Sequence, residues 1–392
     1  MKWKNKGHQF DEIGTYLKDI RNLYIYGAGT LGASLLRWIK KFNPCDCEII
    51  FIDADKQKQK EGYYGIEVLS PECFFQTSIE KSFVVIAVSQ ENSYIIEKDL
   101  KKRGYKENVN FLTIQQFWPI YSIYVKDMIS FPSISFLPTT RCNLNCAACL
   151  NFNSYNENQG NRDLDSLKAD IDIFFKCVDY IGLFHISGGD PLLYPQLDEL
   201  VAYIDCNYRK HIDILSLTTN GTIAPDDALC KIFKKHNLYI ILDDYRENVP
   251  SQLRRNFDII LEKMKNYGIT YEINKVDRWI DLRPLTTNHF DWSEQRLIAH
   301  YENCRNPFQE LRNKKIYSCN YASYAMKAGL NLDSFNDYYD LSVFSPEKKK
   351  ELVEFRLRYT EKGYVDFCKR CSGLSTTINS NFVEVARQIP RK

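Results

Sequence analysis

The sequence lacks a long run of basic residues, an apolar N-terminal segment and any apolar stretch of membrane-spanning length. The formal net charge is only +2, which argues against a nucleic-acid partner. The start, MKWKNKGHQFDEIG, lacks the apolar region of a signal peptide, and no segment approaches the length of a transmembrane helix. We therefore expect a cytoplasmic protein with no membrane partner.

The sequence also lacks internal repeats and low-complexity segments, and its 392 residues exceed what a single hydrophobic core organises. We expect two or three domains.

Cysteine is not scarce, since the chain contains 13. Without a secretion signal, closely spaced cysteines more often bind a metal than form a disulfide framework. We expect six of them to be small buried hydrophobic residues, because they lie within apolar or helical patterns: Cys45, Cys47, Cys73, Cys177, Cys206 and Cys230.

The pattern of residues 1–125 predicts a small α/β domain with a parallel sheet. Apolar runs at 23–26, 47–53 and 83–89 predict buried strands, and 33–41 and 93–104 predict helices. Gly27, Gly29 and Gly32 follow the first strand, and Asp53 ends the second. This is the dinucleotide-binding fingerprint of a Rossmann-like domain, in which glycines admit the phosphates and the acid binds a ribose hydroxyl.

A second alternation of strands and helices begins at residue 133 and gives about six β/α units. The last is the short run WIDLRP at 279–284. This predicts a partial (β/α)6 barrel of the TIM type over residues 126–285. Residues 286–392 are irregular and contain the remaining cysteines, so we expect a third, small domain there.

Cys142, Cys146 and Cys149 directly follow the first predicted strand of the barrel. Thiolates are the ligands of iron–sulfur clusters, and three thiolates on a cubane leave one iron open. The loop also lies at the carboxyl end of a strand, where barrel enzymes place their chemistry. A structural zinc site is the competing interpretation, but no fourth ligand lies within the next dozen residues.

On the basis of these three cysteines, the chain resembles the radical S-adenosylmethionine (SAM) superfamily. The resemblance spans about residues 133–285. The three cysteines match the family's cluster motif. Gly188-Gly189-Asp190-Pro191 resembles its usual Gly-Gly-Glu-Pro motif, which holds the methionine amino group of SAM. Ser216, Thr218 and Asn220 resemble its ribose contacts.

Two residues differ from those usual in the family. Asp190 replaces the commoner Glu, and Ala148 stands where an aromatic residue usually supports the adenine. The resemblance implies that a reduced 4Fe–4S cluster cleaves SAM to a 5′-deoxyadenosyl radical, which abstracts hydrogen from a substrate. It also implies a reductant of the flavodoxin or ferredoxin type.

Four further cysteines, Cys304, Cys319, Cys368 and Cys371, lie beyond the barrel. This extension looks like the auxiliary-cluster region of many family members, in its shorter "twitch" form rather than the longer SPASM form. The resemblance implies a second 4Fe–4S cluster, although four cysteines also form a standard zinc site.

The N-terminal stretch from Gly27 to Glu72 also resembles a small domain of bacterial polysaccharide-biosynthesis proteins, some of which use it to hold a nucleotide-sugar. We expect NAD or a nucleotide-sugar as its ligand. The alternative is a degenerate module that serves only for docking or dimerisation.

We expect an oxidoreductase or epimerase whose substrate is a small molecule, a carbohydrate or a nucleotide-linked sugar. A radical SAM peptide maturase and a non-enzymatic, zinc-stabilised sugar-nucleotide binding protein are the alternatives. Oxidation requires a base, and four charged residues near the ends of the later strands are candidates: Asp243, Asp244, Lys275 and Arg283. Epimerisation requires a hydrogen donor, for which Cys177, Cys206 and Cys230 are candidates.

Overall fold

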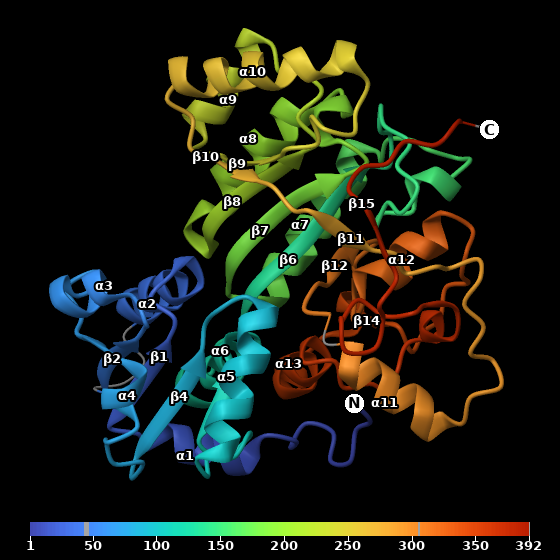
Figure 1. Ribbon diagram of the computed structural model, residues 1–392. Coiled ribbons are helices and arrows are strands. Elements are labelled where there is room, and N and C mark those ends of the chain that lie inside the picture. Colours follow the sequence, from blue (N-terminus) through green and yellow to red (C-terminus); the bar gives the residue numbers. More distant parts are fainter. Residues whose placement is uncertain (43–46, 305, 392) are drawn as a thin grey trace.

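The computed structural model describes residues 1–42, 47–304 and 306–391. Its strands form a five-stranded sheet, an eight-stranded sheet and a two-stranded ribbon. Figure 1 shows the first sheet at the lower left in blue, the second through the centre, and the C-terminal part packed beside it, with the N-terminus next to α11. The α/β class expected from the sequence is confirmed.

The five-stranded sheet is entirely parallel, in the order β3-β2-β1-β4-β5. The chain changes direction between β1 and β4, and such switch points form crevices at the carboxyl edge of a sheet. The strands are β1 (Asn22–Tyr26), β2 (Glu48–Ile52), β3 (Val68–Leu69), β4 (Ser82–Ile86) and β5 (Phe111–Thr113).

Both faces of this sheet are buried, because side chains alternate between them along each strand. Leu23 and Ile25 of β1 belong to the main hydrophobic core, whereas Tyr24 packs in a separate cluster on the opposite face. The main-core face is covered by α1 (Asp11–Lys18), α2 (Thr30–Phe42) and α6 (Ile114–Lys126), and the other by α4 (Pro71–Phe74) and α5 (Gln90–Lys102). The short α3 (Lys56–Glu61) follows β2.

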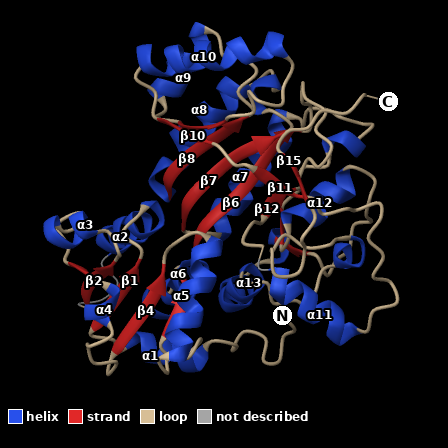
Figure 2. Ribbon diagram, viewed as in Figure 1, coloured by secondary structure: helices blue, strands red, loops and turns tan. Residues whose placement is uncertain are grey.

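The central sheet has the order β10-β9-β8-β7-β6-β12-β13-β14, and β6 to β10 are parallel neighbours. These five strands are β6 (Ser130–Thr139), β7 (Tyr180–Gly188), β8 (Ile212–Thr219), β9 (Tyr239–Asp243) and β10 (Tyr271–Asn274). The helices between them are α7 (Leu164–Cys177), α8 (Leu197–Tyr208), α9 (Asp227–Lys235) and α10 (Ser251–Asn266). Figure 2 shows these helices along one side of the curved strands.

The prediction of six β/α units is wrong, because the run at 279–284 adds no sixth strand. Its residues form β11 (Arg278–Ile280), which pairs antiparallel with β15 (Phe382–Glu384) near the C-terminus. A three-residue strand carries no signal of which partner it pairs with, so the sequence could not reveal this.

The C-terminal part extends the central sheet. β12 (Glu310–Arg312) runs parallel to β6, and β13 (Lys315–Tyr317) and β14 (Tyr338–Asp340) continue antiparallel. The helices of this part are α11 (Glu294–Cys304), α12 (Asn320–Lys327) and α13 (Lys349–Arg356).

The five-stranded sheet lies at the amino ends of the central strands, through helices α2 and α6. Arg37 of α2 forms an ion pair with Asp213 at the start of β8, at 2.7 Å. Trp118 of α6 donates a hydrogen bond to Ser130 at the start of β6, at 2.7 Å. The carboxyl ends of the central strands, where the cysteine loop lies, therefore face away from this junction.

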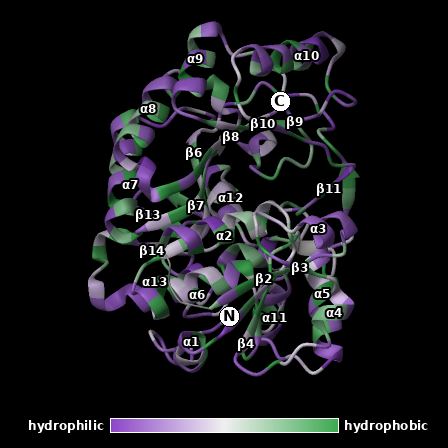
Figure 3. Ribbon diagram, turned by 90° about the vertical axis from the view of Figure 1, so that its left-hand side faces the viewer, coloured by the Kyte–Doolittle hydropathy of each residue, from purple (hydrophilic) through white to green (hydrophobic). Residues whose placement is uncertain are grey.

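None of the described helices is both long and apolar enough to cross a membrane. In Figure 3, strands such as β2 and β4 are largely hydrophobic, whereas the outer helix α9 has both hydrophilic and hydrophobic residues.

The cysteines outside the two predicted cluster groups follow the expectation only in part. Cys177 and Cys230 are buried, but Cys73 and Cys206 are exposed. Cys47 takes part in a disulfide, and Cys45 lies outside the described residues.

Candidate active site at the carboxyl ends of the central strands

The structure brings Cys142, Cys146 and Cys149 together in the loop after β6. All three belong to one small hydrophobic cluster, which also contains Tyr245 and Trp279. Burial, together with the negative charge of Asp190, raises the pKa of the Cys142 thiol to about 12. Burial likewise raises the pKa of Cys146, where the charge of Cys149 adds to the effect.

The cysteine loop is held by the C-terminal segment 384–391, which we name the strap. Gln388 accepts a hydrogen bond from the Asn145 backbone N–H at 2.8 Å and donates one to Cys146 Sγ at 3.2 Å. The backbone of the loop pairs with the strap on both sides of Cys146, because Ala147 N–H donates to Arg387 and Ile389 N–H donates to Asn145. Figure 1 shows this last segment running to the loop beyond β6. No local sequence pattern predicts this contact.

Replacing Gln388 with Ala should lower the reduction potential of a cluster bound at Cys146, so that an external reductant reduces it less readily. Hydrogen bonds to ligating sulfurs spread their negative charge and so raise the potential. Potentiometric titration followed by electron paramagnetic resonance (EPR) spectroscopy measures the shift. Gln388→Glu is the matched variant, since it keeps the oxygen that accepts from Asn145 but loses the donor. We expect it to shift the potential at least as far, and an unchanged potential in both variants would show that the bond to sulfur has no influence.

The Gly188-Gly189 pair lies against the backbone that leads into the cysteine loop. A Cβ on Gly188 would lie 2.5 Å from the Thr139 carbonyl oxygen, and one on Gly189 would lie 2.1 Å from the Arg141 carbonyl oxygen. Gly188 also has a φ of +156°. Glycine is therefore required at both positions by close packing, because a Cβ would push the loop away.

Asp190 and Asn220 connect the ends of β7 and β8 to the same loop. The buried Asp190 carboxylate accepts from Thr219 Oγ1 and from the Asn220 backbone N–H, each at 2.9 Å. Burial outweighs these hydrogen bonds and raises the Asp190 pKa to about 6. The Asn220 side chain donates to Asn143 Oδ1 at 2.9 Å and lies 3.6 Å from Cys142 Sγ. Pro191 begins the short turn that follows.

Ser216 and Thr218 contact a histidine that sequence reasoning missed. His185 on β7 lies between them, with Nδ1 2.8 Å from Ser216 Oγ and Nε2 3.2 Å from Thr218 Oγ1. Ser216 is fully buried, and burial lowers the His185 pKa to about 4. The sequence does contain a signal for this residue. His185 lies on the same face of its strand as Ser187, which directly precedes the Gly188-Gly189 pair.

When the pH falls from 7.5 to 5.0, the free energy of unfolding of the wild-type protein should fall by about 2 kcal/mol more than that of the His185→Gln variant. The folded pKa of His185 lies below its ordinary value of 6.5. Between the two values the unfolded chain binds the additional proton, so this stabilisation is present above pH 6.5 and is lost as the pH falls toward 4. Denaturant titrations at both pH values measure it. His211→Gln, at a half-buried histidine just before β8, should keep the wild-type pH dependence, and equal losses in wild type and His185→Gln would refute the prediction.

Of the four predicted candidates for a base, Asp243 lies closest to the cysteine loop. Its carboxylate accepts from Tyr245 Oη and Asn274 Nδ2, each at 2.7 Å, and burial raises its pKa. Tyr245, which the sequence analysis did not single out, lies close enough to Cys146 and Cys149 for their charges to raise its pKa further.

The other three candidates are engaged in ion pairs or hydrogen bonds with neighbouring side chains. Asp244 pairs with Arg246 at 2.8 Å, which lowers its pKa. Lys275 pairs with Glu247 at 2.8 Å, and both side chains are more than half exposed. Arg283 donates to Thr286 and Asn381 at the surface.

The second cysteine group also converges. Cys304, Cys319, Cys368 and Cys371 are all buried, and burial, together with the charges of neighbouring cysteines, raises the pKa of the last three. Backbone N–H groups of Leu374 and Gly373 lie 3.3 Å from the sulfurs of Cys304 and Cys371. Asn306 Nδ2 lies 3.4 Å from Cys319 Sγ.

Aromatic packing joins the two cysteine groups. Phe152, three residues after Cys149, packs edge-to-face on Phe367, with ring centroids 5.6 Å apart. Both rings belong to the hydrophobic cluster that contains Cys319, Cys368 and Cys371.

The chemistry of both groups fits an iron–sulfur cluster. Among the described residues, no three His, Cys, Asp or Glu side chains are placed to hold a single metal ion. Buried thiols that raise one another's pKa become thiolates only when a positive centre compensates their charge. N–H groups directed at sulfur are also a usual feature of protein-bound clusters.

The glycine loop of the five-stranded sheet is closely packed at two of its three glycines. Gly27 has a φ of +115°, and a Cβ on Gly32 would lie 2.2 Å from the Gly27 carbonyl oxygen, whereas Gly29 has no atom within 4 Å of its Cβ position. Gly29 is thus the position open to a ligand. Asp53 accepts from the Ala28 backbone N–H at 2.8 Å and lies 3.6 Å from Lys58 Nζ, so it stabilises the loop itself.

Comparison with known proteins gives one family match. Residues 136–276 match the Radical SAM superfamily, which confirms the predicted radical SAM domain at this level. An uncharacterized protein of Methanocaldococcus jannaschii is 28% identical over 152 residues, which cover 35% of this chain and 50% of that protein. The chain thus spans about half the length of this relative.

Three solved structures are similar to parts of the chain. Native anSMEcpe with bound AdoMet and the Cp18Cys peptide is 20% identical, with a TM-score of 0.29, over 36% of this chain and 42% of that chain. SuiB of Streptococcus suis bound to precursor peptide SuiA is 15% identical, with a TM-score of 0.29, over 62% and 46%. BtrN in complex with AdoMet and 2-DOIA is 14% identical, with a TM-score of 0.34, over 64% and 98%.

Proposed function

We propose that the protein is a radical SAM enzyme that oxidises an alcohol carbon of a carbohydrate or nucleotide-linked sugar. The observation that carries the proposal is the convergence of three cysteines, the Gly188-Gly189 pair and Asn220 at the carboxyl ends of β6, β7 and β8. Barrel enzymes place their reacting groups at this end of the strands.

In this proposal Cys142, Cys146 and Cys149 bind a 4Fe–4S cluster with one open iron. Gly188, Gly189, Asp190 and Pro191 shape the site of the SAM methionine, and Thr218 and Asn220 border the ribose, with Ser216 supporting them through His185. When bound, the cluster and SAM supply a 5′-deoxyadenosyl radical. The chain's own contribution is to orient SAM, exclude water and hold the substrate near β9 and β10.

Asp243 is the residue we propose as the base. Its raised pKa reflects burial, and a carboxylate in such an environment accepts a proton more readily than an exposed one. Overall, the substrate alcohol loses its carbon-bound hydrogen to the radical, its hydroxyl proton to Asp243 and one electron. A carbonyl results.

Cys304, Cys319, Cys368 and Cys371 are proposed to bind a second 4Fe–4S cluster that accepts this electron. A flavodoxin- or ferredoxin-type protein would be the external reductant. Phe152, three residues after Cys149, packs on Phe367, which precedes Cys368, and this contact between the two groups supports electron transfer between them.

Oxidation is favoured over epimerisation by the positions of the spare cysteines. Cys177, Cys206 and Cys230 belong to α7, α8 and α9, not to the strands that surround the proposed substrate site. Each would have to act from the outer layer of the fold to return a hydrogen atom.

The N-terminal unit, residues 1–125, is proposed to bind a nucleotide-containing ligand at its carboxyl edge, beside Gly29. This unit lies at the amino ends of the central strands, whereas the triad follows their carboxyl ends. β7 alone has nine residues, which span about 30 Å. A ligand at the glycine loop is therefore separate from the reacting carbon unless it is very long.

The test uses anaerobically reconstituted protein, SAM, a chemical reductant and candidate sugars in deuterated buffer. One 5′-deoxyadenosine per carbonyl formed, without solvent deuterium at the product carbon, is the expected result. Deuterium at an inverted carbon would indicate epimerisation, and a methylated product would refute the oxidation. Stoichiometric zinc without iron would refute the whole proposal.

A double substitution tests the role of the second cluster separately. Cys368→Ser with Cys371→Ser should lower the iron content from about eight to about four atoms per chain. It should keep reductive cleavage of SAM but lose carbonyl formation, because the substrate radical has no electron acceptor. Equal carbonyl yields in variant and wild type would rule out an electron-accepting role for this group.

A further inference from the structure

A cavity of about 690 Å³ lies between the five-stranded sheet and the C-terminal part. From the sheet it is lined by Leu31 in the first turn of α2, by Val88 and Ser89 after β4, and by Thr113 at the end of β5. These positions are the carboxyl edge of the sheet, beside the switch point between β1 and β4. The volume is within the range of about 300–1,000 Å³ that small-molecule sites occupy.

The opposite wall of the cavity carries two arginines, Arg356 and Arg358. Arg356 is 3% exposed, and within the described part of the chain it donates one hydrogen bond, from Nη2 to the Ser133 carbonyl oxygen at 3.2 Å. Arg358 donates to the Tyr301 carbonyl oxygen at 2.6 Å. The Nε atoms of both are buried without a hydrogen-bond partner, and neither guanidinium forms an ion pair with a described carboxylate.

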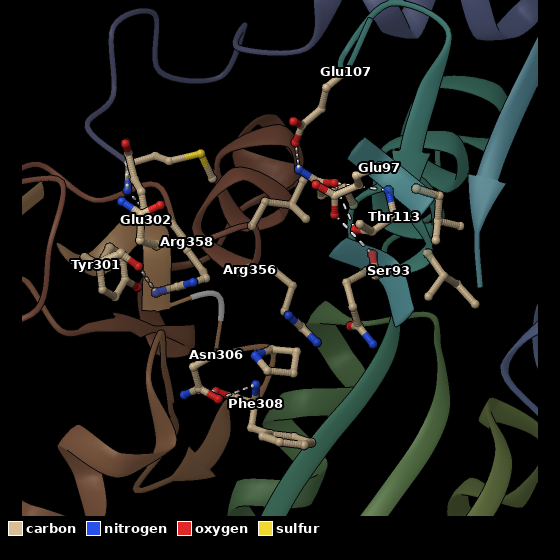
Figure 4. Close-up of a pocket in the computed structure, with 18 of the residues that line it drawn as sticks. Ser93, Glu97, Glu107, Thr113, Tyr301, Glu302, Asn306, Phe308, Arg356 and Arg358 are labelled. Atoms are coloured by element: carbon tan, nitrogen blue, oxygen red, sulfur yellow. Dashed lines mark hydrogen bonds and ion pairs between the residues drawn. The ribbon is translucent and has the colours of Figure 1, made fainter. Parts of the chain in front are cut away.

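Two adjacent buried cations with no carboxylate partner among the described residues are costly to maintain in a folded chain. The cost is greater for Arg356 than for Arg358, whose pKa is raised because the charges of Tyr301 and Cys304 outweigh burial. Burial and the charge of Arg358 together lower the Arg356 pKa to about 10. Figure 4 shows Arg356 lying in the middle of the cavity, with Arg358 and Asn306 to one side and Ser93 to the other. An anion in this cavity would compensate both charges and could accept hydrogen bonds from guanidinium donors.

The wall opposite the arginines suits hydroxyl groups rather than a second anion. Ser93, Glu97 and Thr113 line it, and Ser93 Oγ donates to Glu97 Oε1 at 3.1 Å. Carboxylates accept hydrogen bonds from sugar or ribose hydroxyls, whereas they repel phosphates. Glu107 and Glu302 line the rim, and Leu31, Ile86, Val88 and Phe308 form apolar surface between the two walls.

We propose that this cavity binds a phosphorylated polyhydroxy compound, with its phosphoryl group at Arg356 and Arg358 and its hydroxyls at Ser93, Glu97 and Thr113. A sugar phosphate and a nucleoside diphosphate share this chemistry. The site needs both the five-stranded sheet and the C-terminal part, so ligand binding fixes the two against each other. The inference does not depend on either cluster or on SAM cleavage.

The test is isothermal titration calorimetry of the full chain with three probes: uridine diphosphate, glucose 1-phosphate and unphosphorylated uridine. At least one phosphorylated probe should bind and uridine should not, and the two phosphorylated probes distinguish a nucleotide from a simple sugar. Arg356→Gln and Arg358→Gln should each weaken binding by about 10- to 100-fold, since each removes a charge-assisted hydrogen bond. Arg103→Gln, at an exposed arginine at the end of α5, is the matched control and should bind like wild type.

A steric variant covers the case in which an arginine variant fails to fold. Ala299→Trp places a large side chain at an exposed position of α11 that lines the cavity. It should abolish binding while both arginines remain.

Gly29→Asp separates this site from the glycine loop, because it adds a negative charge there at a position where a Cβ meets no atom within 4 Å. Loss of binding in Gly29→Asp, with unchanged binding in both arginine variants, would place the phosphate on the glycine loop and overturn the inference. Absence of heat with both phosphorylated probes in folded wild-type protein would also overturn it. Neither result bears on 5′-deoxyadenosine formation.

Discussion

The triple variant Cys142→Ala, Cys146→Ala and Cys149→Ala should form no detectable 5′-deoxyadenosine and should bind about four iron atoms per chain instead of about eight. The three thiols are gathered in one cluster of side chains, and no other described cysteine belongs to it. Removing them leaves no thiolate for the proposed SAM-binding cluster, whereas the second cysteine group is untouched. Iron analysis, EPR spectroscopy and chromatography of the products measure the three effects.

A matched control for this variant is Cys73→Ala with Cys206→Ala. Both cysteines are exposed and outside the two groups, so iron content and product formation should equal those of wild type. If the triple variant retained the full iron content, or still released 5′-deoxyadenosine, the assignment of these ligands would be wrong.

Gly189→Ala should destabilise the protein by about 3 kcal/mol and remove most of the iron bound by the first cysteine group. The added methyl group would lie 2.1 Å from the Arg141 carbonyl oxygen and 2.4 Å from its carbon, both in the backbone. Backbone atoms move only with the chain, so the segment that enters the cysteine loop must shift. Thermal melting and iron analysis measure the effect.

Gly160→Ala provides the comparison at the same site. The Gly160 carbonyl accepts from Thr140 N–H at 2.9 Å, next to Arg141, yet no atom lies within 4 Å of its Cβ position. We expect a change in stability within about 0.5 kcal/mol and full iron content. Equal effects of the two substitutions would show that close packing at Gly189 is not what requires glycine.

The motifs that could be read from the sequence are those formed by residues close together in the chain. The cysteine spacing, the Gly188-Gly189 pair and Asn220 each follow one strand directly, and parallel strands bring their carboxyl ends to one edge. The general arrangement of this site was therefore predictable. The sequence pattern also gave most of the helices and strands, since their apolar residues repeat with the period of each element.

The parts that could not be predicted depend on contacts between distant residues. Gln388 reaches Cys146 across 242 positions, and no local pattern marks it as a partner. β11 and β12 are three residues long, so their pairing is decided by tertiary packing rather than by propensity. Lys275 was a reasonable candidate by position, but the sequence does not reveal that Glu247 pairs with it at the surface.

The strap has a consequence for protein synthesis. Gln388 is translated 242 residues after Cys146, which at about 5–20 residues per second takes roughly 10–50 s. During that interval the nascent chain presents the cysteine loop without the strap that closes it in the finished fold. Delivery of iron and sulfide during this interval would meet an open loop, whereas delivery after release from the ribosome would require the strap to detach first.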